Sequence, residues 1–257
     1  MERLGTPNKA PFGISANALR IWGLLFLTAG AVGRGLLQTR LLGVGSTNTE
    51  QLLAAMDANM GAATAAIVLQ IVEACAAPIF AFLLVEGFTH TKNVKNYLLR
   101  VLAVAVISEI PYNLAISGVL LNPESRNPAF SLVLGLVMLS LYARYPGKTL
   151  KNILIKVMVT AAALVWAKML AIDSANCMVV ILAGLWAFRK KPMLRTFGGA
   201  LVTMLCVVMD PLYMVAPMGF LAVHTYNGEQ GGANRVTNYA AYPVLLLLVA
   251  GACWVVF

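Results

Sequence analysis

The sequence predicts an all-α protein, a polytopic transmembrane helical bundle of about nine spans with a cytoplasmic N-terminus. Three observations predict this class. Of the 257 residues, 60% are hydrophobic and only 11% are charged, whereas about 25% is usual in a soluble domain. The mean hydropathy is +0.80. The apolar residues form continuous runs without the alternation of outer-membrane strands. Together these observations exclude a disordered chain, a soluble enzyme and a secreted domain.

Residues 1–257 are expected to form one membrane domain, with a cytoplasmic segment at 1–17 and a transmembrane bundle with short loops at 18–257. A spanning helix needs about 20 apolar residues. The second and third apolar runs are long enough to tilt, and the sixth to eighth are short enough to be partial spans. The runs lie at 18–37, 62–88, 97–121, 130–144, 153–170, 176–188, 196–208, 212–226 and 236–257.

Basic residues set the expected orientation, because positive loops resist translocation. With nine spans, the clusters fall on one side, which we assign to the cytoplasm, and the C-terminus is external. This distribution explains the net charge of +9 without a nucleic-acid partner. The four cysteines lie inside apolar runs without metal-ligand spacing, so no metal site is expected. The basic clusters are Arg3, Lys9 and Arg20; Lys92 and Lys95; Arg144, Lys148 and Lys151; Arg189 to Arg195; and Arg235.

A short capped helix is expected between the first two runs. Thr47-Asn48-Thr49-Glu50 can cap it, and its apolar residues are mixed with polar ones. Such a helix would lie along the external interface.

Acidic residues within apolar runs are the first candidates for function, because an ionised carboxylate costs at least about 2.5 kcal/mol there. Glu86 and His90 are four residues apart and share a helix face. A carboxylate that orients an imidazole produces a general base. The alternative is an interfacial capping pair. Glu73 has a simpler interpretation, a buried ion pair with Arg34.

The third run contains a dense polar patch, Ser108-Glu109-Ile110-Pro111-Tyr112-Asn113. Pro111 cannot donate a backbone hydrogen bond, so carbonyls there become free to meet a ligand or another helix. Two interpretations stay open. Glu109 belongs to a mid-membrane site with Tyr112 and Asn113, or it is protonated or paired with Arg100 or Lys156 to hold helices together.

The run from Ala77 to Asn93, APIFAFLLVEGFTHTKN, with residues 95–100 and the segment SEIPYNL at 108–114, closely resembles the TraX family. Weaker likeness at Asn127-Pro128, 226–228 and Tyr242-Pro243 extends the resemblance over most of the chain. The family is named for a conjugation-plasmid membrane protein that acetylates the N-terminus of pilin. The resemblance therefore implies a multi-pass protein of the bacterial inner (cell) membrane that resembles membrane acyltransferases.

The resemblance also implies reactants and residue roles. The donor is acetyl-CoA or another acyl-CoA from the cytoplasm, and the acceptor is an amine or hydroxyl on a small molecule, a peptide or a lipid. Residues that match the family's polar pattern are Glu86, His90, Arg100, Glu109 and Asn113. Of these and their neighbours, Glu86, His90 and Glu109 are the catalytic candidates, and Lys92, Arg100, Tyr112 and Asn113 are the substrate-binding candidates.

The chain departs from the family at two places. Gly30 and Ala31 stand where the family carries an Asp-His pair, and Val244-Leu245 follow Tyr242-Pro243 where the family has a second histidine. His90 is then the remaining histidine base candidate. Two other hypotheses stay open: a non-catalytic protein that binds or transports a small molecule or lipid around Glu109, and a membrane assembly partner.

Overall fold

A computed structural model describes residues 13–232 and 235–256, and over these ranges the chain is helical, with two isolated β-bridges. The all-helical class is confirmed. Five helical stretches are long and apolar enough to cross a membrane, and four shorter apolar stretches accompany them. The count of nine spans and the cytoplasmic N-terminus stay predictions. Residues 1–12 of the expected cytoplasmic segment, with Arg3 and Lys9, lie outside the described residues.

The first candidate membrane span, Ala16–Leu41, is an α-helix that continues directly into a π-helix. Helix α1 (Ala16–Ala31) begins at Ser15, whose side chain accepts a hydrogen bond from the Ala18 N–H at 3.3 Å. It continues as a π-helix, η1 (Val32–Leu41). The short helix α2 (Thr49–Ala54) follows, capped by Asn48, so the capped helix expected there is confirmed.

The second apolar run forms two helices, although the sequence predicted one. Helix α3 (Met60–Ala74) ends at a break at Cys75, and α4 (Ala76–His90) begins beyond it. The reason is Pro78, which has no N–H to bond the carbonyl of Ala74. At the break, the Cys75 thiol donates a hydrogen bond to the carbonyl of Val215 at 3.4 Å. The break places Glu73, near the end of α3, at the junction of several elements.

The remaining helices begin and end close to the predicted apolar runs. The third run is shorter than predicted, because Gly118 at φ +72° leaves the helical conformation after residue 116. The 3₁₀ segment η2 extends α9, and the 3₁₀ segment η3 leads into α10. The elements are α5 (Val94–Ile116), α6 (Ala129–Arg144), α7 (Leu150–Met169), α8 (Ala175–Phe188), α9 (Pro192–Leu205), η2 (Cys206–Val208), η3 (Pro211–Met218), α10 (Gly219–His224) and α11 (Arg235–Val256).

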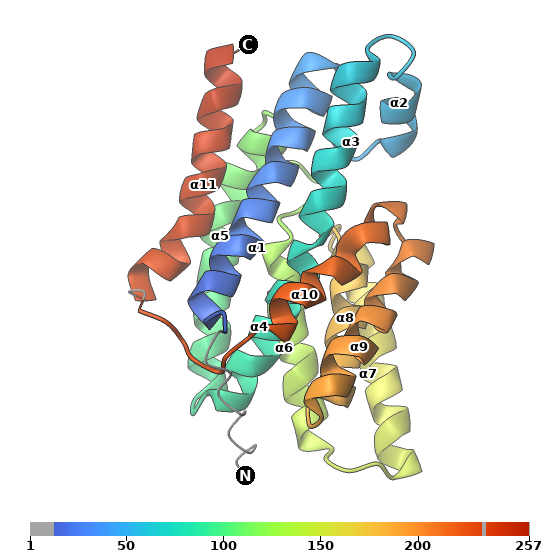
Figure 1. Cartoon of the computed structure of the whole chain (residues 1–257), viewed down its shortest axis with the longest axis vertical. Coiled ribbons are helices and arrows are strands. Elements are labelled where there is room, and N and C mark those ends of the chain that lie inside the picture. Colours follow the sequence, from blue (N-terminus) through green and yellow to red (C-terminus); the bar gives the residue numbers. More distant parts are fainter. Residues whose placement is uncertain (1–12, 233–234, 257) are drawn as a thin grey trace.

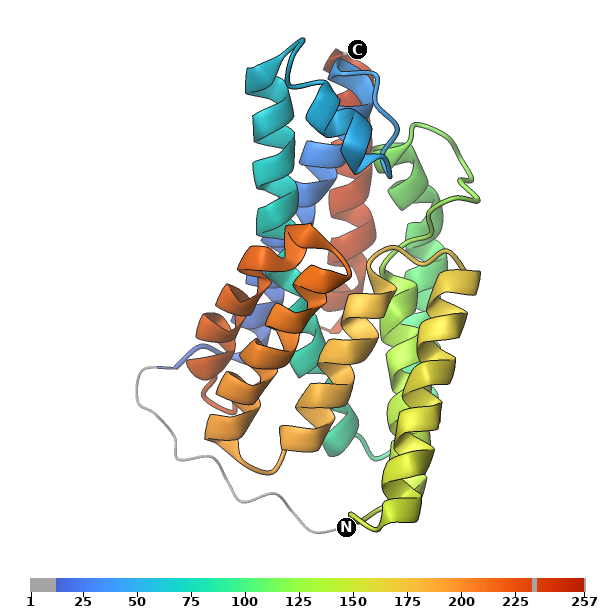
Figure 2. The ribbon, with the colours of Figure 1, turned by 90° about the vertical axis from the view of Figure 1, so that its right-hand side faces the viewer.

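The helices form two groups at different heights. Helix α11 packs against α5 and α1, and α3 packs against α1 and η1. These helices reach the upper end of the molecule in Figure 1, where α11 ends. Helices α7, α8 and α9 stop well below that end, as Figure 2 shows. The loops joining the shorter helices therefore lie beside the C-terminal end of α3, near Glu73.

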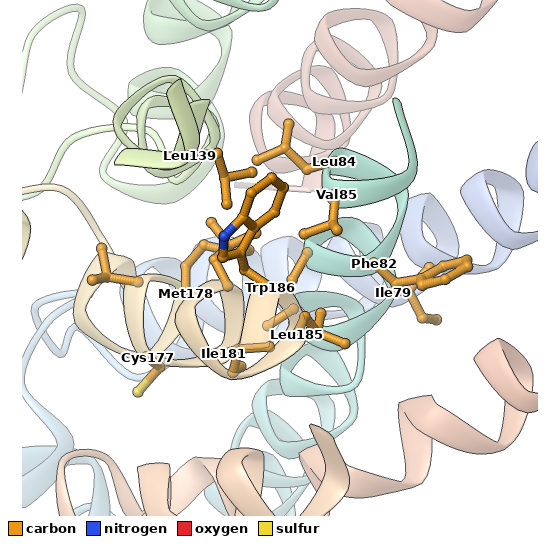
Figure 3. Close-up of a cluster of buried hydrophobic side chains, with 14 of the residues drawn as sticks. Ile79, Phe82, Leu84, Val85, Leu139, Cys177, Met178, Ile181, Leu185 and Trp186 are labelled. Carbon is orange, nitrogen blue, oxygen red and sulfur yellow. The ribbon is translucent and has the colours of Figure 1, made fainter. Parts of the chain in front are cut away.

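The main core lies where α4, α6 and α8 meet. Figure 3 shows its side chains interdigitating around Trp186, whose ring meets Phe88 edge-on at 5.6 Å. Gly135 of α6 lets α8 approach closely, because a Cβ there would overlap Leu182. Close approach matters in a bilayer, where packing rather than release from water holds helices together. All four cysteines are free and buried, as their apolar surroundings predicted.

Candidate functional site

A buried ion cluster lies at the junction of η1, α3 and the loop before α8. The guanidinium of Arg34 contacts the carboxylate of Glu73 through Nη2 and that of Asp173 through Nη1. The side chains keep 11%, 14% and 21% of their accessible surface, respectively. The predicted pair of Glu73 with Arg34 is confirmed. Asp173 is an addition that the sequence did not reveal.

Local backbone features bring this cluster together. Arg34 lies in the π-helical part of the first stretch, where the wider turns are typical of functional sites. Gly30 faces the carboxylate of Glu73, and a Cβ at position 30 would overlap it. Gly35 allows a similarly close approach to the carbonyl of Ala115. The glycines of α1 and η1 thus give α3 and α5 room to reach Arg34.

Asp173 is the best-supported ion of the cluster. The Tyr112 hydroxyl donates to its Oδ2 at 2.8 Å, and the Ser174 hydroxyl donates to Oδ1 at 3.3 Å. Burial opposes its ionisation, but the charge of Arg34 and these hydrogen bonds outweigh burial and lower the pKa of Asp173. One guanidinium serves two carboxylates here. The cluster therefore carries a negative charge unless it binds a proton.

Glu109 belongs to a second polar network beside this cluster. Its Oε2 accepts from the backbone N–H of Asn127 at 3.1 Å, and its Oε1 accepts from Asn113 at 3.4 Å. The hydroxyl of Tyr242 donates to Oδ1 of Asn127 at 2.9 Å. Glu109, Tyr112 and Asn113 therefore lie in adjoining networks, and the mid-membrane ligand site at these residues stays a prediction.

The alternative ion pairs for Glu109 are wrong. Arg100 is exposed, and the Lys156 ammonium donates to the carbonyl of Gly147 at 3.1 Å. Neither forms an ion pair with Glu109 within the described ranges. The α5 backbone turns Glu109 toward the loop before α6 instead, where an N–H of Asn127 satisfies it.

Glu86 and His90 lie together at the other end of α4. Nδ1 of His90 hydrogen-bonds the backbone carbonyl of Glu86 at 2.9 Å, and the Glu86 carboxylate lies 3.7 Å away. The carbonyl, rather than the carboxylate, therefore fixes the imidazole. Arg195 of α9 approaches the Glu86 carboxylate to 4.0 Å. The His90 side chain is 63% exposed, and Lys92 is exposed as well.

Two cavities approach the ion cluster from opposite ends. The first has a volume of about 200 Å³ and a mainly apolar lining, with Arg20, Tyr97, Asn238 and Tyr239 at the end where α1 begins. The second measures about 420 Å³ and is polar; Arg34, Asp173 and Asp210 line it. Glu73 lines both. Glu73 therefore lies between the two cavities.

The structure thus separates the predicted site residues. Glu86, His90, Lys92 and Arg100 are not among the residues that line the two cavities, whereas Tyr112 holds Asp173 at the wall of the second. Sequence inspection missed Asp173 because an aspartate in a short loop is typical of a helix end. In the structure, the loop that holds Asp173 is strained, because Ala171 and Ser174 both have positive φ.

The model of a family described as TraX protein matches residues 51–252, which is most of the chain. The chain belongs to the TraX family. No curated protein and no solved structure matches it. The match begins within α2 and ends within α11.

For this TraX-family chain, the matched region contains most of both networks. Glu73, Glu109, Asn127, Asp173 and Tyr242 lie within it. Arg34 and Gly30 precede it. The first helix, which supplies the cation of the cluster, is therefore the part of the site that lies outside the matched region.

Proposed function

We propose that this protein is a membrane-embedded acyltransferase that moves an acetyl or other acyl group from a CoA thioester to an amine. The single observation that carries the proposal is the position of Glu73, which lines both an apolar cavity from one end of the bundle and a separate polar cavity. Two reactants entering from opposite sides would meet at one carboxylate. Holding two reactants at a common point is a major source of catalysis.

The apolar cavity is proposed as the path of the donor. Under the orientation that the basic loops predict, its mouth is cytoplasmic, where CoA is available. Arg20 lies at this mouth, and Lys92 and Arg100 are exposed toward the same end of the bundle. Basic side chains there would attract the phosphates of CoA. Tyr97 and Asn238 offer partners for the amides of the pantetheine arm.

The polar cavity is proposed as the acceptor site. Three carboxylates, Glu73, Asp173 and Asp210, line it with one guanidinium, Arg34. This excess of negative charge favours a cationic acceptor, a protonated amine, over a neutral hydroxyl. Asp210 also caps η3, where its Oδ1 accepts from the Leu212 N–H at 3.0 Å.

The reaction would proceed by direct attack. The ammonium first loses a proton to Glu73, and the amine nitrogen then attacks the thioester carbonyl carbon. A C–N bond forms, the C–S bond breaks, and the second nitrogen-bound proton reaches the CoA sulfur, which leaves as the thiol. Arg34 lies beside Glu73, where its charge can stabilise the oxyanion.

Glu73 fits the role of base better than His90. The carboxylate of Glu73 fills the space above Gly30, where the resemblance places the acidic member of the family's Asp-His pair. An acid is therefore still present at this point, supplied by α3 instead of α1. His90 is largely exposed and does not line either cavity.

The test compares CoA release by purified variants that have been checked for folding in detergent. Glu73→Gln keeps the size and the contact with Arg34 but removes the base, and we expect acyl-CoA turnover to fall at least about 100-fold. His90→Ala and the exposed control Glu50→Gln should stay near the wild-type rate. Full activity in Glu73→Gln, or its loss in His90→Ala, would contradict the assignment.

A second candidate function is binding or transport without chemistry. The break between α3 and α4 beside Glu73 favours it, because interrupted helices often form mid-membrane binding sites in transporters. This function predicts saturable ligand binding that Glu109→Gln or Glu73→Gln weakens and that acyl-CoA does not compete with. Folded protein that releases no CoA from any acyl-CoA would favour it.

A further inference from the structure

A third hollow lies between the end of α7, the start of α8 and the loop before η3. It measures about 510 Å³ and is lined by Leu164, Val165, Lys168, Met169, Asn176 and Met209. Most of this lining is apolar. Helix α7 is the least buried of the candidate spans, with 11% of its most apolar window inside the bundle. If α7 crosses the membrane, the groove faces lipid.

The groove adjoins the polar cavity. Asn176 and Met209 line both of them. The Oδ1 atom of Asn176 is buried and has no hydrogen-bond partner in the described structure, although buried polar atoms are nearly always satisfied. An N–H donor from a bound molecule would satisfy it. Asn176 and Met209 thus separate the groove beside α7 from the cavity that Glu73 lines.

The charge of the lining residues changes sign from the groove to the polar cavity. Lys168 is exposed at the groove and forms none of the ion pairs in the described part of the chain. Farther in, Asp173 and Asp210 line the cavity. A zwitterionic headgroup matches this order, with its phosphate outside and its ammonium inside. A headgroup without an amine would satisfy only Lys168.

We propose that the groove and the polar cavity together bind a phospholipid with a primary-amine headgroup, such as phosphatidylethanolamine, which enters sideways from the bilayer. Its acyl chain lies against Leu164, Val165 and Met169, and its phosphate lies at Lys168. Its ammonium reaches toward Asp210, and Asn176 accepts one of its N–H groups. As an acceptor, which rests on the proposed function, the amine gains the acyl carbon and CoA leaves as the thiol.

The experiment measures lipid binding to delipidated full-length protein in detergent by native mass spectrometry. Phosphatidylethanolamine, phosphatidylcholine and phosphatidylglycerol with identical chains are added in turn. We expect phosphatidylethanolamine to be retained at least about tenfold more than the other two. Lys168→Glu should weaken retention of all three lipids, because each carries the phosphate, and Asn176→Ala should reduce the preference for phosphatidylethanolamine. Lys151→Glu, a charge reversal at the other exposed end of α7, should leave both the retention and the preference unchanged.

Equal retention of the three lipids would overturn the proposal, as would lipid retention that Lys168→Glu leaves intact. Equal binding of phosphatidylglycerol and phosphatidylethanolamine would show phosphate recognition alone and would also overturn it. A parallel assay follows CoA release and N-acylated lipid. Selective lipid binding without CoA release would refute the acyltransferase function and leave the lipid site standing. CoA release with another amine, without lipid selectivity, would support the acyltransferase function and refute the lipid site.

Discussion

At the scale of single residues, the two aspartates of the polar cavity differ in how the fold treats their charge. Asp173 is held by Arg34, Tyr112 and Ser174, which lower its pKa despite burial. Burial raises the pKa of Asp210, and the backbone N–H of Leu212 and the charge of Arg34 offset this effect only in part. The first carboxylate stabilises the fold when ionised. The second costs stability and is retained, on our proposal, for an incoming cation.

The two aspartates should therefore respond oppositely to neutralisation. At pH 7, Asp173→Asn should lower the free energy of unfolding by roughly 3 kcal/mol, because it breaks a buried pair. Asp210→Asn should leave stability unchanged or raise it by up to about 1 kcal/mol, because the amide still caps η3 without the cost of a charge. Thermal unfolding in detergent measures both, and a stabilised Asp173→Asn would contradict the ion cluster.

The two pKa shifts also predict opposite effects of pH on the stability of the fold. A group whose pKa is lowered by folding stabilises above its unfolded value of about 3.9 and loses that contribution as the pH falls. Asp173 should therefore make the wild type less stable in acid. The raised pKa of Asp210 acts in the opposite sense, since stability is lost as the pH rises above about 3.9.

At the scale of elements, the contact between α1 and α3 depends on Gly30. A glycine inside a helix costs roughly 0.5–1 kcal/mol relative to alanine. Overpacking a buried contact costs about 1–3 kcal/mol, and a Cβ at Gly30 would overlap the Glu73 carboxylate. The overlap should outweigh the gain in helix propensity.

Gly30→Ala is therefore expected to destabilise the protein by roughly 1–2 kcal/mol and to displace Glu73. Gly251→Ala in α11, where a Cβ meets nothing within 4 Å, should be neutral or stabilising and is the matched control. Removing the carboxylate in Gly30→Ala/Glu73→Ala should recover part of the loss. Strict additivity of the two changes in a double-mutant cycle would show that the residues do not share this space.

Sequence patterns predicted the elements better than the site. Hydropathy located the apolar runs because each helix carries its own signal over many residues. The break at Cys75 was missed, although Pro78 stood in the sequence. The cluster at Arg34 joins residues 39 and 139 positions apart, and no local pattern reports such a contact. Glu73 was identified as a buried partner of Arg34, but its place between two cavities depends on the packing of distant helices.

At the scale of the whole molecule, the two helix groups of unequal height determine where a ligand can enter. The loops beside α7, α8 and η3 end near the C-terminal end of α3 (Figure 2), so the polar cavity, which residues of these loops line, lies at that level. The apolar cavity opens at the opposite end. A donor and an acceptor on opposite sides of the membrane therefore require that the shorter helices cross it.

Topology can be tested by labelling single introduced cysteines in intact cells with an impermeant maleimide, since the four native cysteines are buried. Glu50→Cys and Glu124→Cys should react from outside. Lys148→Cys and Lys191→Cys should react only after the membrane is opened.

Met209→Cys decides whether the seventh and eighth apolar runs cross the membrane. Met209 lies between the seventh run, formed by α9 and η2, and the eighth run, formed by η3 and α10. If both halves cross the membrane, this thiol reacts from outside, and the acidic cavity that it lines faces outward. If it is protected in intact cells and reacts after permeabilisation, the two halves form a hairpin that does not cross. The acceptor would then share the cytoplasmic side with CoA, and a path across the membrane would be excluded.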